Sequence, residues 1–104
     1  MAVQVVRSRK QPQEDISSLV TVDTTVYQTY EQQCITDGVL TSAVATPADS
    51  SLIAVETMTF PDAENALKFF VEIVYNPSLQ NNVNNAITAQ GNVGCTWTYT
   101  INMN

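Results

Sequence analysis

Residues 60–75, FPDAENALKFFVEIVY, decide the fold because they carry the clearest helix signal in the chain. Apolar residues recur there at steps of three and four, which places them on one stripe of a helix. Asp62 is the expected N-cap, and Pro61 lies before it, where no helical N–H is needed. Asn76-Pro77 ends the segment, because a residue before proline is disfavoured in the α region. We predict a helix over 61–75 whose buried stripe is Ala63, Ala66, Leu67, Phe70, Ile73 and Val74.

Strand patterns lie on both sides of this helix. Residues 2–8 and 39–46 are short runs rich in valine, alanine and threonine, and residues 51–59 follow a Pro-Ala-Asp-Ser turn. Residues 93–103, VGCTWTYTINM, alternate apolar and polar side chains most clearly. The third run is apolar on both faces: Leu52, Ala54, Met58 and Phe60 share one, and Ile53 and Val55 share the other.

Two further segments are harder to assign. The spacing of apolar residues in 16–38 fits a helix, whereas its threonine and valine content favours a strand. More than twenty residues without a turn signal is long for a strand, so we expect a helix over about residues 22–36, ended by Asp37-Gly38. Residues 78–91 contain four asparagines and predict only a short, weak helix.

The resulting order is strand, helix, strand, strand, helix, strand. It predicts an α+β, ferredoxin-like fold in which two helices cover one face of a four-stranded antiparallel sheet. The uncovered face carries Ile53 and Val55 in the third strand, and an apolar face of this kind favours a partner. We therefore expect a homodimer whose interface includes these two residues. If the helices cover this face instead, Leu52, Ala54 and Met58 form the interface.

The element order, together with the strand-to-helix entry TMTFPDAENALKFF at residues 57–70, resembles the dimeric α+β barrel superfamily. That superfamily includes the antibiotic-biosynthesis-type monooxygenases. The resemblance implies two sheets packed face to face in a dimer. It also implies a ligand site for a small aromatic or haem-like molecule between sheet and helices, and it identifies no catalytic residue in this chain.

Composition limits the possible chemistry. The 104 residues predict one domain, and the net charge of −6 argues against extended nucleic-acid binding. Histidine is absent, and the two cysteines form no CxxC pair, so we expect no metal, no haem and no other cofactor. No apolar run is long enough to span a membrane. We expect two reduced thiols and a cytoplasmic protein, or a virion-associated one if it is viral.

The positive charge is concentrated near the start of the chain. Arg7, Arg9 and Lys10 lie in the first ten residues, whereas the remainder has ten acidic side chains and a single base, Lys68. Two interpretations remain open for this basic cluster. It either contacts a phosphate or an acidic neighbour, or it is a solvated strand end.

Candidate site residues are few. Glu56 lies among apolar residues in the third strand, where burial would raise its pKa and suit it to acid–base chemistry. The alternative is a carboxylate bonded to a threonine or tyrosine hydroxyl at an edge or an interface. Trp97 and Tyr99 share a strand face, and Tyr27 and Tyr30 are positioned to line a pocket with them or to pack the core.

Two function classes follow. The first is a non-catalytic homodimer with a structural or interaction role, of the kind found among small viral or phage components. The second is a small monooxygenase-like enzyme, or a binding protein, acting on an apolar or aromatic molecule. A closed internal cavity beside Glu56, Trp97 and Tyr99 would favour the second class, and a filled core would favour the first.

Overall fold

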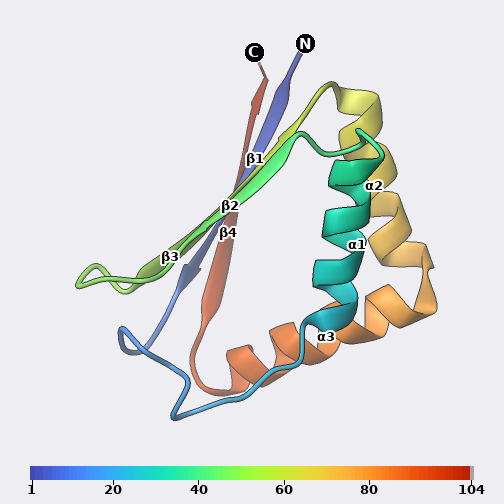
Figure 1. Cartoon of the computed structure of the whole chain (residues 1–104). Helices are drawn as coiled ribbons and strands as arrows, with labels where there is room; N and C mark the ends of the chain where they lie inside the picture. The colour runs from blue at the N-terminus through green and yellow to red at the C-terminus, as the bar shows by residue number, and fades with distance from the viewer. Residues whose placement is uncertain (104) are drawn as a thin grey trace.

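The computed structural model describes residues 1–103, which form one four-stranded antiparallel sheet with three helices on one face (Figure 1). The sheet order is β2-β3-β1-β4. The strands are β1 (Val3–Lys10), β2 (Ser42–Thr46), β3 (Ile53–Phe60) and β4 (Thr96–Met103), and the helices are α1 (Thr25–Thr36), α2 (Ala63–Tyr75) and α3 (Pro77–Asn92). This is the ferredoxin-like arrangement with one additional helix, so the predicted fold class is confirmed.

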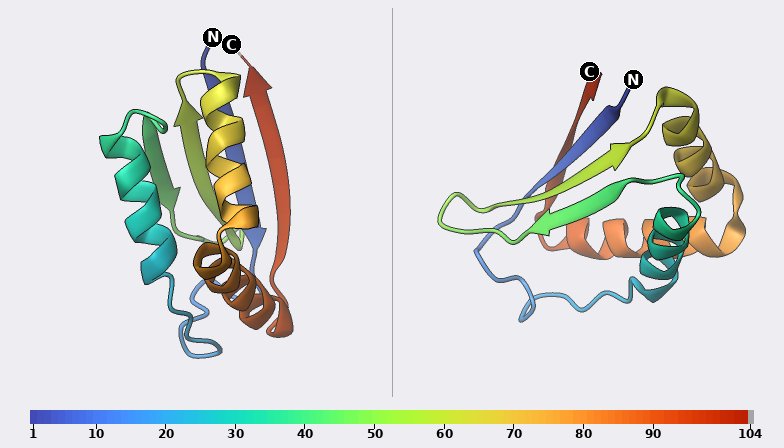
Figure 2. Two further views of the ribbon diagram at one scale, coloured as in Figure 1. Left: turned by 90° about the vertical axis from the view of Figure 1, so that its right-hand side faces the viewer. Right: turned by 45° about the horizontal axis from the view of Figure 1, so that its top comes forward.

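The register of the central strands separates the two faces of the sheet. Val3 lies opposite Phe60, and Val5 lies opposite Met58. Residues paired in this way project from the same face. All four side chains are buried beneath the helices, whereas the alternate residues of each strand point to the other face, which no helix covers (Figure 2).

Helix α2 packs on this core through Phe69, which is fully buried, and through Ala66. The Phe69 ring lies 5.3 Å from that of Phe60 and 5.1 Å from that of Tyr30 on α1. The buried stripe predicted for α2 was therefore rotated around the helix axis relative to the observed one. It omitted Phe69 and included Leu67 and Val74, which are 66% and 55% exposed. The aromatic contacts with α1 and β3 set the rotation of the helix, and spacing along one helix does not reveal them.

Side-chain caps define where α2 and α3 begin. Asp62 Oδ1 accepts a hydrogen bond from the backbone N–H of Asn65 at 2.8 Å, which confirms the predicted N-cap. Asn76 ends α2, and its Oδ1 accepts from the N–H groups of Ser78 and Leu79. The expected stop is therefore also the start of α3. A helix was expected over 78–91 and is present there, but with 16 residues it is not short, and it adds a third helix to the two that were predicted.

The segment between β1 and α1 also differs from expectation. β1 continues to Lys10 instead of ending at residue 8, and α1 begins at Thr25 rather than near residue 22. The side chain of Gln11 is buried, and its Nε2 donates to the carbonyl oxygens of Gln13 and Glu14. Residues 11–24 thus form a loop whose first turn is held from within by the buried Gln11 side chain.

Phe69→Ala should lower the free energy of unfolding by about 3–5 kcal/mol, because it removes a fully buried ring and leaves a cavity. Leu67→Ala, on the exposed flank of the same helix, should cost less than about 1 kcal/mol. Chemical denaturation of both variants measures this difference. Equal losses would show that the helix is rotated from the orientation described.

Candidate functional site

The helix-covered face of the sheet changes character halfway along its strands. Beyond Val3 and Val5, β1 presents Arg7 and Arg9 to the same face. In register with them on β3 lie Glu56, opposite Arg7, and Ala54, opposite Arg9. One half of the covered face is therefore a hydrophobic core, and the other half carries charge beneath the helices.

Glu56 joins the strands to α1 in this polar half. Its Oε2 lies 3.5 Å from Nη2 of Arg7, and its Oε1 accepts a hydrogen bond from the hydroxyl of Tyr27 at 3.3 Å. The side chains of Arg7 and Glu56 are 27% and 15% exposed, so solvent screens their attraction less than that of a surface pair. Burial, followed by the charges of Glu56 and Glu31, raises the pKa of Tyr27 and keeps its hydroxyl protonated as a donor.

Glu31 lies one helical turn beyond Tyr27 on α1 and is half-buried. Its Oε2 is buried, and within residues 1–103 it has no hydrogen-bond partner. Burial is the largest influence on its pKa, and the negative charge of Glu56 is the second; together they raise this pKa above 4.5, although Tyr27 and Arg7 act in the opposite direction. Glu31 is therefore a carboxyl group held where its protonated form is favoured.

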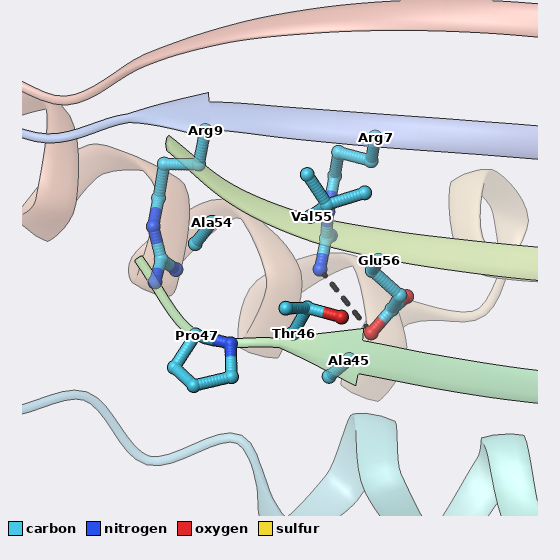
Figure 3. Close-up of a pocket in the computed structure, with 8 residues that line it drawn as sticks. All are labelled: Arg7, Arg9, Ala45, Thr46, Pro47, Ala54, Val55 and Glu56. Atoms are coloured by element: carbon cyan, nitrogen blue, oxygen red, sulfur yellow. Dashed lines mark ion pairs between the residues drawn. The ribbon is translucent and has the colours of Figure 1, made fainter. Parts of the chain in front are cut away.

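A hollow of about 300 Å³ opens beside the ion pair. We call it the arginine hollow; it is lined by Arg7, Arg9, Ala45, Thr46, Pro47, Ala54, Val55 and Glu56. Figure 3 shows Arg7 and Arg9 extending from β1 in the same direction, with Arg7 reaching Glu56 and Arg9 reaching toward Pro47. The hollow lies where the polar half of the sheet continues toward the β2–β3 turn.

A second, smaller hollow of about 80 Å³ shares Arg7 and Arg9 with the first. It lies between the sheet, the start of α1 and α3, and Tyr27 and Trp97 are part of its wall. Asn82 of α3 fixes this junction, because its Oδ1 accepts from the backbone N–H of Tyr27 at 3.0 Å and its Nδ2 donates to the carbonyl of Asp23. The two arginines thus stand between two adjoining spaces.

The structure brings some of the proposed pocket residues together and separates others. Glu56 lines the arginine hollow, and Tyr27 and Trp97 line the smaller hollow that adjoins it. Tyr30 instead donates from its hydroxyl to the carbonyl oxygen of Phe69 at 2.8 Å, so it ties α1 to α2. Tyr99 lies opposite Arg7 on the edge strand β4 and is 53% exposed.

The residues that sequence reasoning undervalued are Arg7, Arg9, Glu31 and Asn82. The two arginines were considered only as part of a basic cluster with Lys10. Alternation carried the missing signal, because Arg7 and Arg9 continue the phase of Val3 and Val5, whereas Lys10 belongs to the other face. Glu31 stands four residues after Tyr27, and this helical spacing gave a weaker signal.

The structure also bears on metal binding, on the state of the cysteines and on membrane-spanning helices. Within residues 1–103, no group of three or more acidic or cysteine side chains lies close enough together to hold a metal ion. Cys34 and Cys95 are both buried free thiols. In the described part of the chain, none of the helices has the length and apolarity needed to traverse a bilayer.

Comparisons with known proteins give little further guidance. No protein family matches the chain, and no curated protein matches it. Among solved structures, an uncharacterized NIPSNAP-like domain protein from Burkholderia xenovorans is similar, at 11% sequence identity and a TM-score of 0.48, over 98% of this chain and 84% of that one.

Glu31→Gln should stabilise the protein by about 1 kcal/mol at pH 7, the lower end of the cost of a buried polar atom without a partner. The folded-state pKa of Glu31 is raised, so its favourable contribution is complete below pH 4.5 and is lost as the pH rises through the raised pKa. The increase in the free energy of unfolding caused by Glu31→Gln should therefore shrink toward zero in acid. Urea denaturation at pH 4 and pH 7 measures both values.

Glu14→Gln provides the matched control, because it removes the same charge from an exposed loop position. It should leave the free energy of unfolding nearly unchanged at either pH. A loss of stability in Glu31→Gln at pH 7 would mean that the ionised carboxylate makes a favourable contact, contrary to this account.

Proposed function

We propose that this chain is a homodimeric binding module that holds a small molecule between the sheet and the helices of each protomer. The observation that carries the proposal is the unfilled polar half of the covered face. Two hollows that open to solvent flank a partly buried arginine pair there. Concave sites that combine apolar walls with a few polar groups are typical of small-molecule binding.

Binding fits the site better than catalysis does. Both oxygens of Glu56 already have partners, Arg7 for one and Tyr27 for the other. A carboxylate held in this way stabilises the junction of β1, β3 and α1, and its partners compete with the proton that a general base would accept from a substrate. Glu31 lies one turn further along α1 and does not line either hollow.

The homodimer is supported by the sheet face opposite the helices. Ile53 and Val55 both project from this face, because they alternate with Ala54 and Glu56, which face the helices. Ile53 is 40% exposed and Val44 on β2 is 59% exposed, and Lys10 is the single charged side chain among the strand residues of this face. A broad face of aliphatic and threonine side chains matches a second copy of itself through two-fold symmetry.

Fragment binding tests the ligand site. A mixed library of small acids, amides and amines, observed through ¹H–¹⁵N NMR, should shift the backbone signals of Arg9, Ala54 and Glu56. The indole N–H of Trp97 should also respond, and it is readily assigned because the chain has one tryptophan. Leu67 and Val74, on the exposed flank of α2, serve as the internal reference. A library in which no fragment moves the site signals would contradict the proposal.

Val55→Lys should dissociate the dimer, because two-fold symmetry places the new charge on both sides of one interface. The far-UV circular dichroism should be retained, since Val55 lies outside the helix-covered core. Light scattering at micromolar concentration should give twice the 11.4 kDa chain mass for the parent protein and one chain mass for the variant.

The matched control is Leu67→Lys, which adds the same charge to the exposed flank of α2. This variant should remain dimeric. Dissociation by Leu67→Lys, with Val55→Lys still dimeric, would move the interface to the helical side. On that side part of β4 lies beyond the edge of α2 (Figure 2), and Leu67 and Val74 of α2 and Ile101 and Met103 of β4 are exposed. A parent protein of one chain mass would overturn the dimer.

A further inference from the structure

We propose that the arginine hollow binds a small organic monocarboxylate, with its carboxylate on the guanidinium of Arg9 and its apolar part against Ala45, Ala54 and Pro47. This inference rests on the proposed function and names the chemical class of its ligand.

The hydrogen-bond donors of Arg9 are only partly used inside the fold. Its Nε and Nη2 both donate to Oε1 of Gln11, at 3.0 and 2.7 Å. These two bonds use one edge of the planar guanidinium. The edge formed by Nη1 and the second N–H of Nη2 makes no hydrogen bond to residues 1–103, and it presents two parallel donors. A carboxylate matches such an edge with two parallel N–H···O bonds.

The positive charge of Arg9 has no acidic partner among residues 1–103. Arg7 and Glu56 form the one ion pair within residues 1–103, so Arg9 has no carboxylate within 4 Å in the described chain. Arg9 is nevertheless half-buried, in a protein with a net charge of −6. The partner of Arg9 inside the fold is a neutral amide, and its charge remains available for one anionic group. Glu56 in the same wall opposes a ligand with a second negative charge.

The guanidinium of Arg9 is held in one orientation by Gln11. Gln11 is 5% exposed, and its Nε2 donates to the carbonyl oxygens of Gln13 and Glu14. Its backbone N–H donates to the carbonyl of Leu52 at 2.8 Å. The side-chain amide that holds Arg9 is therefore fixed by two hydrogen bonds and its backbone by a third, so the free edge of the guanidinium is oriented before any ligand arrives. Preorganisation of this kind reduces the entropy cost of binding.

Much of the remaining wall of the hollow is apolar, because Ala45, Ala54 and Pro47 offer methyl and ring carbons but no side-chain donors. Thr46 adds one hydroxyl, and the Arg7 guanidinium already faces Glu56. The additional oxygens of a phosphate would find few hydrogen bonds there, whereas the hydrocarbon part of a carboxylic acid would be accommodated. The volume of about 300 Å³ lies at the small end of ligand sites, which suits a short aliphatic or single-ring acid.

The experiment compares hexanoate and benzoate with hexanamide, benzamide and inorganic phosphate, each titrated into the full chain and followed by NMR. Both acids should bind at least about tenfold more tightly than their amides, because the bidentate charge-assisted bonds are lost with the charge. Arg9→Gln should weaken acid binding by a similar factor.

Two variants complete the design. Lys10→Gln removes the same charge from the next residue, which is exposed on the opposite face, and it should change acid binding by less than about twofold because solvent screens that charge. Ala54→Leu fills the hollow without touching the donors of Arg9, and it should abolish acid binding. This second variant keeps the test decisive if Arg9→Gln disturbs the loop at Gln11.

Each other outcome is informative. Equal binding of acids and amides in the hollow overturns the carboxylate class and leaves the binding module intact. Phosphate binding as tight as that of the acids replaces the monocarboxylate with a bare oxyanion, and equal losses in Arg9→Gln and Lys10→Gln show a long-range charge effect in place of a site. Failure of every fragment in the NMR library overturns the proposed function itself.

Discussion

The ion pair between Arg7 and Glu56 is the interaction on which the polar half of this protein depends. Both side chains lie beneath the helices, and each leaves an uncompensated charge if the other is removed. Glu56 also accepts from Tyr27, so the pair connects β1 and β3 to α1. The pair exists because β1 and β3 are in register, with Arg7 directly opposite Glu56.

The same register explains why half of the covered face is packed and half is hollow. Phe60 and Met58 meet valines on β1 at one end, where Phe69 of α2 closes the core. Two pairs further along, Ala54 lies opposite Arg9, so a short side chain faces a long one that extends beyond it. Aliphatic packing ends there, and the charged ends of the two arginines are held apart, Arg7 by its ion pair with Glu56 and Arg9 by its hydrogen bonds to Gln11.

Much of this fold follows from patterns along the chain. The four strands, the N-cap at Asp62 and the stop at Asn76 were all readable, because alternation and capping are local properties. The rotation of α2 was not, since it depends on where Phe69 meets Tyr30 and Phe60 across the fold. The length of α3 was missed because asparagine has a low intrinsic helix propensity, yet Asn82 is held by its contacts with α1.

The candidate site was harder to predict than the fold, because its contacts also join residues that are far apart in the sequence. Glu56 was recognised from its place among apolar residues, but its partners come from β1 and α1, far from it in sequence. Arg7 and Arg9 were grouped with Lys10 by proximity in the chain, although the pleat sends Lys10 to the opposite face.

Once the strand phase is known, Lys10 and the two arginines have different roles. Lys10 remains in solvent, where a charge costs little. Arg9 is placed partly out of water with only an amide for a partner, and a half-buried cation of this kind is most simply explained if its free edge receives an anion.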